Sequence, residues 1–279
     1  MDTGLAALQV LITGASGGIG QALADAFADE GAGLVLHAAT REGALERFPD
    51  AVRLAADLRT AAAAESMVAR ALAAVDRLDV CIINAGVWPE PDAPLHHLDP
   101  QRIRDVIEIN LLGAIWTARA FVQALARTGP RADGRGASVC LIGSTAGRFG
   151  EAGHLEYAVS KAGLYGLVRS LKNEIVAVDP RARVNMVEPG WTVTPMAAPA
   201  LAREGLIERV LQTVPLRQLA RPEDIAAATV FLSAPQLAAH VTGEVLTVAG
   251  GMEGRRLWAP AQIDPDDVRA RVGLPRQGR

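Results

Sequence analysis

The 279-residue chain is half hydrophobic and carries a formal net charge of −3 at pH 7, so it can bury a sizeable core and offers no basic excess to a nucleic acid. Its two cysteines, Cys81 and Cys140, lie inside apolar runs typical of buried strands, which favours free thiols in a reducing compartment. The first residues lack a signal-peptide pattern and no apolar run approaches the roughly 20 residues of a membrane span, so we expect a cytoplasmic protein that does not bind membranes.

Short apolar runs alternate with longer helical patterns along the chain. Seven runs predict strands, at residues 8–13, 34–38, 52–55, 78–83, 138–142, 184–187 and 245–248. Continuously hydrophobic strands are expected where helices cover both faces of a parallel sheet. The alternation therefore predicts a single doubly wound α/β domain, a Rossmann fold with a seven-stranded parallel sheet, over residues 1–254.

Two helical patterns are especially clear, at residues 101–127 and 156–178, the second ending before Pro180. From residue 255 onward the chain is polar and contains prolines, which predicts a C-terminal tail over 255–279. Within it we expect a short helix with Asp264 as N-cap and Pro265 at its first position.

The first predicted strand runs into the glycine-rich segment GASGGIG at residues 14–20, and an amphipathic helical pattern follows. Gly14 permits a tight turn, while Gly18 and Gly20 let backbone amides at the start of the helix approach a pyrophosphate, whose charge the helix dipole favours. This strand–turn–helix context predicts a dinucleotide site. An ordinary glycine-rich turn between a strand and a helix is the alternative.

The residues after the second strand bear on which nicotinamide cofactor binds. An acidic side chain there would hydrogen-bond the ribose 2′-hydroxyl of NAD, but the segment HAATR has none and ends in Arg41. A guanidinium can pair with the 2′-phosphate of NADP, so NADP(H) is favoured over NAD(H). A solvated Arg41 that merely follows the strand is the alternative.

Tyr157 and Lys161 are four residues apart in a helical pattern, which places them on one face, one turn apart. A nearby ammonium favours the phenolate, so we expect Lys161 to lower the pKa of Tyr157 from its unperturbed value of about 10. Tyr157 could then exchange a proton with the oxygen of a carbonyl or an alcohol. Such pairs occur by chance on many helices, but here Ser144 ends the preceding strand, at the edge where open α/β sheets bind ligands.

In their order along the chain, these motifs resemble the classical short-chain dehydrogenase/reductase family. The motifs are TGASGGIG at Thr13, ADL around Asp57, NAG at Asn84, Asn110 in IEINLLG, Ser144, YAVSK at Tyr157, PG at Pro189 and RPEDIA at Arg221. The resemblance implies hydride transfer between NAD(P)(H) and a carbonyl or secondary alcohol. It includes traits of members that reduce 3-oxoacyl thioesters on acyl carrier protein, although other members share them.

The resemblance also implies roles for individual residues. Tyr157 would be the general acid/base, Ser144 would orient the substrate oxygen, and Lys161 would bind the nicotinamide ribose. Asn110 would hold a water in the proton relay, unless it only bends its helix. With Arg41 included, the expected cofactor contacts are Gly14, Ser16, Gly18, Ile19, Gly20, Arg41, Asp57, Leu58, Asn84, Ala85, Gly86, Tyr157, Lys161, Pro189, Gly190, Thr192 and Thr194.

The resemblance further implies a substrate lid over about residues 193–218 and a homotetramer or homodimer that pairs the two long helices. Four residues depart from the family pattern, Gly17, Leu58, Ile83 and Glu188, and two of them bear on the expected site. Gly17 stands where NADP-using members often have arginine, which weighs against the NADP preference. Glu188 is unusual directly before Pro189, and we interpret it as a solvated strand end in preference to a substrate-facing acid.

The sequence does not identify the small-molecule substrate. A 3-oxoacyl thioester is one reading, and a sugar, polyol or steroid-like alcohol is the alternative. A non-catalytic nucleotide sensor or scaffold is a rival of another class, which the presence of Asn110, Ser144, Tyr157 and Lys161 disfavours. Residues that could contact the substrate are Trp88, Arg148, Glu151, His154, Trp191 and Met196. His96 and His97 show no metal-ligand pattern, so we expect no catalytic metal.

Overall fold

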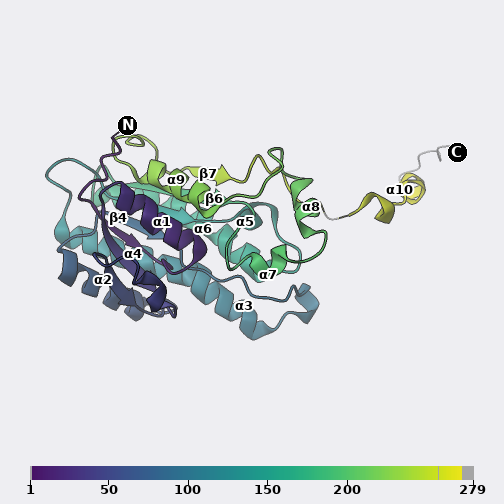
Figure 1. The fold of residues 1–279 in the computed structure, drawn as a ribbon, viewed down its shortest axis with the longest axis horizontal. Coiled ribbons are helices and arrows are strands. Elements are labelled where there is room, and N and C mark those ends of the chain that lie inside the picture. Colours follow the sequence, from purple (N-terminus) through teal and green to yellow (C-terminus); the bar gives the residue numbers. More distant parts are fainter. Residues whose placement is uncertain (1, 257, 272–279) are drawn as a thin grey trace.

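The computed structural model describes residues 2–256 and 258–271. At its centre lies a seven-stranded parallel sheet with the strand order β3-β2-β1-β4-β5-β6-β7 (Figure 1). The strands are β1 (Gln9–Ile12), β2 (Gly33–Ala38), β3 (Val52–Ala55), β4 (Val80–Ile83), β5 (Ser138–Ile142), β6 (Arg183–Pro189) and β7 (Val245–Val248). All seven predicted strands are present, and the doubly wound α/β class is confirmed.

Helices cover both faces of this sheet. The α-helices are α1 (Gly18–Asp29), α2 (Ala61–Val75), α3 (Pro100–Ile107), α4 (Gly113–Thr128), α5 (Thr145–Phe149), α6 (Leu155–Glu174), α7 (Ala198–Leu201), α8 (Leu206–Leu211), α9 (Pro222–Ser233) and α10 (Pro265–Arg271). Short 3-10 turns are η1 (Glu42–Leu45), η2 (Leu95–His97), η4 (Ile175–Ala177) and η5 (Pro260–Gln262).

Two hydrophobic layers follow from the alternation of side chains along each strand. In β1, Val10 and Ile12 pack toward α1 and α9, where Phe27 is fully buried, whereas Leu11 packs toward α2, α4 and α6 around Phe121. Each strand thus contributes to both layers, which explains why the strands are hydrophobic throughout and do not alternate with polar residues.

The strand order reverses beside β1, because the chain passes from β1 to β2 on one side and β4 lies on the other. Open α/β sheets bind ligands in the crevice that forms at the carboxyl ends of the strands at such a point. The loops that follow β1, β4 and β5 therefore meet at one edge of the sheet.

The predicted helix at 101–127 is one continuous helix from Pro100 to Thr128 that changes pitch in its middle. Asp99 caps α3 by accepting a hydrogen bond from the Gln101 backbone N–H at 2.9 Å, and the π-helical turn η3 (Glu108–Leu112) joins α3 to α4. This helix is long and apolar enough to cross a membrane, but it packs against α2 and α6 and half of its apolar stretch is buried inside the protein. It is a core helix of the fold.

Beyond β7 the described chain ends in α10, which stands apart from the rest of the molecule (Figure 1). The Asp264 carboxylate accepts hydrogen bonds from the backbone N–H groups of Asp266 (2.9 Å) and Asp267 (3.2 Å), so the predicted helix start is confirmed. Residues 257 and 272–279 of the predicted tail lie outside the described residues.

Candidate active site

A cavity of about 680 Å³ opens at the carboxyl edge of the central strands, within the size range of small-molecule sites. Every residue that we predicted for catalysis or cofactor binding lines this cavity except Asn110. Segments that are far apart in the sequence therefore meet around one space: the glycine loop, the ends of β2 to β6, and the start of α6.

The glycine loop fits the close approach of a pyrophosphate. Gly14 has a φ of +64°, and a Cβ placed on it would lie 2.8 Å from the Ala85 backbone, so only glycine suits this turn. No acidic residue occupies the first turn of α1, which leaves its N-terminal amides free to favour an anion. A Cβ on Gly18 would lie 3.0 Å from Thr194, so the loop also touches the start of the predicted lid.

The His37 side chain contacts the glycine loop, and the sequence did not point to this residue. The Gly14 N–H donates to His37 Nδ1 at 3.2 Å, so Nδ1 must be an acceptor and Nε2 donates to the Ala56 carbonyl at 2.9 Å. Burial lowers the pKa of His37, which favours the neutral ring that this arrangement requires. One imidazole thus links the loop after β1 to the end of β3.

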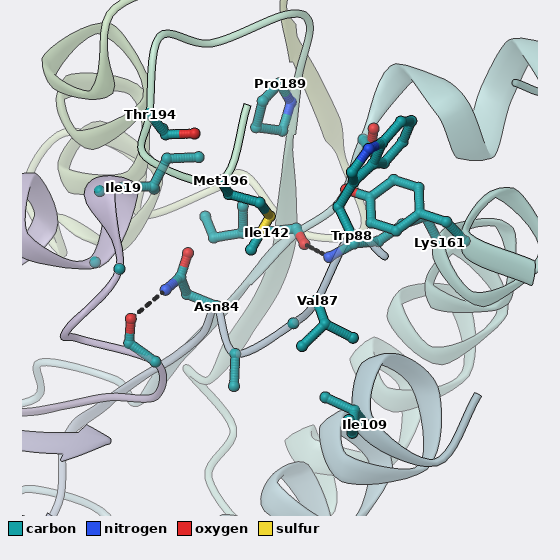
Figure 2. Close-up of a pocket in the computed structure, with 18 of the residues that line it drawn as sticks. Ile19, Asn84, Val87, Trp88, Ile109, Ile142, Lys161, Pro189, Thr194 and Met196 are labelled. Carbon is teal, nitrogen blue, oxygen red and sulfur yellow. Dashed lines mark hydrogen bonds between the residues drawn. The ribbon is translucent and has the colours of Figure 1, made fainter. Parts of the chain in front are cut away.

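Asn84, at the end of β4, fixes the other side of the loop. Its side-chain amide donates to the carbonyls of Thr13 (3.0 Å) and Gly14 (3.1 Å), as the dashed bond beside Asn84 illustrates (Figure 2). The Asn84 and Ala85 backbone N–H groups both donate to the Thr13 hydroxyl, at 3.0 and 3.1 Å. The amide therefore holds the turn in shape, while Ala85 and Gly86 line the cavity.

The ends of β2 and β3 form the far end of the cavity, and two arginines lie there. Arg41 lines this end as predicted, and Arg59, which the sequence reading missed, lines it as well. Arg59 Nε contacts both oxygens of the Asp57 carboxylate, at 2.9 and 3.0 Å, and this contact holds the pKa of Asp57 below its ordinary value. The Asp57 charge is thus balanced by its neighbour.

Tyr157 and Lys161 project from the first turns of α6 toward Ser144. Ser144 caps α5 by accepting from the Ala146 N–H at 3.1 Å, and its side chain lies close enough to Tyr157 to oppose the rise in the pKa of the phenol. Lys161 is buried and donates to the Ile142 carbonyl at 2.9 Å, with Nζ 5.8 Å from the centre of the tyrosine ring (Figure 2). The end of β5 and the start of α6 therefore bring the three side chains together.

The pKa of Tyr157 corrects one expectation. We expected the Lys161 ammonium to lower it, but burial of the phenol raises the pKa to about 12, against an opposing effect of the Ser144 hydrogen bond. The charge of Glu151 raises it further. Burial also lowers the pKa of Lys161 to about 8. Burial has the largest effect because it disfavours the charged phenolate.

Asn110 lies behind the cavity wall, in the π-helical turn η3. Its side-chain oxygen accepts from the Val87 N–H at 2.8 Å, and its amide donates to the Val87 carbonyl (3.0 Å) and the Ser160 hydroxyl (3.2 Å). The side chain thereby ties the loop after β4 to α6. Its predicted part in a proton relay stays a prediction.

Four of the six residues proposed as substrate contacts line the cavity, namely Trp88, Glu151, Trp191 and Met196. Arg148 and His154 do not. The Trp88 ring centre lies 4.6 Å from that of Tyr157 in an edge-to-face arrangement and 6.1 Å from that of Trp191. Aromatic side chains therefore form one wall beside the tyrosine hydroxyl.

Glu188 corrects a second expectation, because it is not a solvated strand end. Its side chain is 0% exposed; it accepts hydrogen bonds from the hydroxyls of Tyr165 and, at 3.0 Å, Thr247, and Arg148 Nη1 lies 3.7 Å away. Burial raises the pKa of this carboxyl. The partners come from α6, β7 and α5, so nothing near Glu188 in the sequence pointed to them.

Arg203, within the predicted lid, is tied to the loop after β4. It forms ion pairs with Asp92 (2.8 Å) and Glu90 (3.3 Å), and His154 Nε2 lies 2.9 Å from Asp92. Ligand atoms of Glu90, Asp92 and His154 lie within 4.8 Å of one another, a spacing that could hold a cation. The Arg203 guanidinium already pairs with both carboxylates, and the absence of a catalytic metal stays a prediction.

Comparisons with known proteins agree with this geometry. A family model described as enoyl-(acyl carrier protein) reductase matches residues 14–253. The chain is 37% identical over 250 residues to cis-4-hydroxycyclohexanecarboxylate dehydrogenase of Sinomonas cyclohexanicum, covering 86% of this chain and 94% of the relative. It is 33% identical over 247 residues to the 3-oxoacyl-[acyl-carrier-protein] reductase FabG of Escherichia coli, covering 87% and 96%.

Among solved structures, the chain is similar to one from Brucella melitensis described as a short-chain dehydrogenase/reductase, glucose/ribitol dehydrogenase. The TM-score is 0.80 at 29% identity, with 91% of this chain and 99% of the other covered. The named substrates of these proteins differ from one another, whereas the reaction type, reduction or dehydrogenation, is common to all of them.

Proposed function

This chain belongs to the short-chain dehydrogenase/reductase family and is an oxidoreductase acting on carbonyl or alcohol groups; we propose that it interconverts a ketone and a secondary alcohol with NADP(H), using Tyr157 as general acid/base. The observation that carries the proposal is the meeting of Tyr157, Ser144 and Lys161 in the same cavity as the glycine loop. A nucleotide sensor would need the loop but not this group of hydroxyls and a buried amine.

The proton would pass through Tyr157. In the reducing direction the phenol donates to the substrate oxygen, and its pKa of about 12 keeps it protonated at neutral pH. Because Ser144 and Tyr157 line the same cavity and lie close together, the two hydroxyls can hold one substrate oxygen between them. In the oxidising direction Tyr157 accepts the alcohol proton, which a charged Lys161 would favour.

A nicotinamide cofactor would supply or accept the hydride. The residues of this chain fit such a group, since the amides at the start of α1 suit a pyrophosphate and Gly14, Gly18 and Gly20 line the cavity there. Lys161 and the segment from Pro189 to Thr194 would hold the nicotinamide end. Asp57 and Leu58 would flank the adenine.

NADP(H) is the preferred cofactor in this proposal. Arg41 lines the cavity after β2, while Arg59 at the same end is paired with the Asp57 carboxylate. Guanidinium groups suit a 2′-phosphate, and described residues 39–41 after β2 carry no carboxylate that would select the ribose hydroxyl of NAD.

Two substrate classes have specific support. Similarity to 3-oxoacyl-[acyl-carrier-protein] reductase supports a 3-oxoacyl thioester. The aromatic wall of Trp88 and Trp191, together with similarity to a cyclohexane-alcohol dehydrogenase, supports a cyclic alcohol or ketone. Flat aromatic faces suit the sides of a ring, whereas an extended thioester needs a groove that leads out of the pocket.

A substrate panel tests the proposal. NADPH absorbance would be followed with 3-oxoacyl thioesters, cyclic ketones and sugars, and we expect turnover in at least one class. If NADPH binds but no carbonyl or alcohol in the panel is turned over, the sensor reading is the better one.

Residues 193–218, which include α7 and α8, would act as the substrate lid, with the Arg203 ion pairs holding it near the pocket. We also propose a homotetramer or homodimer that pairs α4 and α6. Sedimentation velocity would show a monomer if this assembly is wrong. A cytoplasmic location stays a prediction.

A further inference from the structure

Arg255 reaches back from the segment after β7 into the cavity. Its Nε lies 2.8 Å from a carboxylate oxygen of Glu151, and its Nη2 donates to the Thr145 hydroxyl at 3.1 Å. The two charged side chains are only 15% and 19% exposed, so their pairing is largely shielded from water. The sequence alone assigned Arg255 to a C-terminal tail.

This ion pair lies beside the proton-transfer group. Glu151, Arg255 and Tyr157 line the same cavity, and Thr145 directly follows Ser144, which lies close to Tyr157. Arg255 therefore contacts the short helix α5, whose N-cap is Ser144.

The charged groups around Tyr157 come from several elements. Lys161 is on α6, Glu151 is in the loop between α5 and α6, and Arg255 follows β7. Glu188, at the end of β6, lies close enough to Arg255 to feel its charge. Of these groups, Glu151 opposes ionisation of the phenol, and Arg255 is its direct counter-charge.

We propose that Arg255 balances the negative charge of the Glu151 carboxylate beside Tyr157. The segment after β7 is then part of the proton-transfer machinery. The inference rests on the proposed function for its kinetic consequences. Arg255 and Glu151 act as positioning residues, since they influence the reaction through Tyr157.

The pair would set the pH dependence of both directions of the reaction. Alcohol oxidation needs Tyr157 as a base, so an uncompensated Glu151 carboxylate would disfavour the phenolate and move oxidation to higher pH. Carbonyl reduction needs the neutral phenol, so its loss at alkaline pH would move to higher pH as well. An ion pair that only anchored the chain would move neither pH midpoint.

The test compares Arg255→Met, Glu151→Gln and the double variant in the full chain. We expect the midpoint of the pH profile for kcat/KM of alcohol oxidation to move up by about half to one unit in R255M, below the 1–3 units of a directly adjacent charge. In E151Q it should move down, and in the double variant it should return close to the wild type. Shifts that are absent, or that have the same sign in both single variants, would overturn the proposal.

Controls separate this effect from damage to the fold. Arg119→Met removes an exposed ion pair with Glu65 between α4 and α2, and the pH midpoint should not change. Arg255→Lys keeps the charge, so its midpoint should stay near that of the wild type even if R255M proves unstable. A shift in R255K as large as that in R255M would contradict a charge effect.

A direct readout keeps this inference distinct from the proposed function. The chain has two tyrosines, so Tyr157 can be assigned in a ¹³Cζ-tyrosine NMR titration with Tyr157→Phe as the blank. The alkaline onset of its chemical-shift change should come at higher pH in R255M and at lower pH in E151Q. This measurement requires no turnover, and unchanged onsets would refute the inference even if the enzyme is active.

Discussion

The nucleotide end of the cavity is built mainly from backbone at the ends of strands, whereas the substrate end is built from side chains on distant loops. At the first end, Gly14 and Asn84 set the path of the chain itself. At the second, Trp88, Glu151 and Arg255 meet across long sequence separations. A backbone turn depends on a short local motif that the sequence displays. At the second end the sequence pointed to Trp88 and Glu151, but not to Arg255 or to the contacts between these side chains.

The largest predicted effect is a loss of turnover at the substrate end that leaves cofactor binding at the nucleotide end intact. Tyr157→Phe removes the titratable hydroxyl and should lower kcat about 100- to 10,000-fold, because a positioned acid/base contributes that much. NADPH affinity, measured by fluorescence titration, should stay within a few-fold of the wild type. Retained turnover would show that another group transfers the proton.

The next largest effect should fall on the nucleotide end alone. Gly14→Ala forces a Cβ to within 2.8 Å of the Ala85 backbone at a φ of +64°. We expect NADPH affinity to fall about 5- to 30-fold, from a strain of roughly 1–2 kcal/mol. In the matched Gly166→Ala control on α6, the new Cβ meets open space, and affinity should be unchanged. Equal affinities for the two variants would refute the close approach at Gly14.

A smaller effect should distinguish NADPH binding from NADH binding at the nucleotide end. Arg41→Met removes a charged donor, so the KM for NADPH should rise about 10-fold, the low end expected for an exposed charge-assisted hydrogen bond. The KM for NADH should change little. If both constants rise equally, or the wild type clearly prefers NADH, the NADP assignment is wrong.

The smallest effect concerns the buried carboxyl of Glu188 in β6. Its pKa is raised in the folded protein, so this carboxyl favours folding below its unfolded pKa and loses that contribution as the pH rises through the folded value. Thermal unfolding should therefore show Glu188→Gln gaining stability relative to the wild type between about pH 4 and pH 7. A constant difference in Tm across that range would argue against burial of the ionised form.

Periodicity predicted the seven strands and the two long helices, and the motifs with the family resemblance predicted most of the residues that line the nucleotide end of the cavity. His37, Arg59 and Arg255 were missed, since a single side chain in a strand, loop or tail carries no periodic signal. Glu188 was misjudged because its partners Tyr165 and Thr247 are distant in sequence. The sign of the Tyr157 pKa shift depends on burial, which spacing from Lys161 does not report.

In the π-helical turn η3, the number of residues matters as much as their identity. A regular α-helix turns about 100° per residue, so deleting one residue between 108 and 112 would let the backbone close into ordinary α-helix. The same deletion would rotate α4 relative to α3, and the Asn110 contacts with Val87 and the packing of α4 on α2 could not both persist. Relatives that share this site should therefore vary here by substitution and never by a single-residue gap.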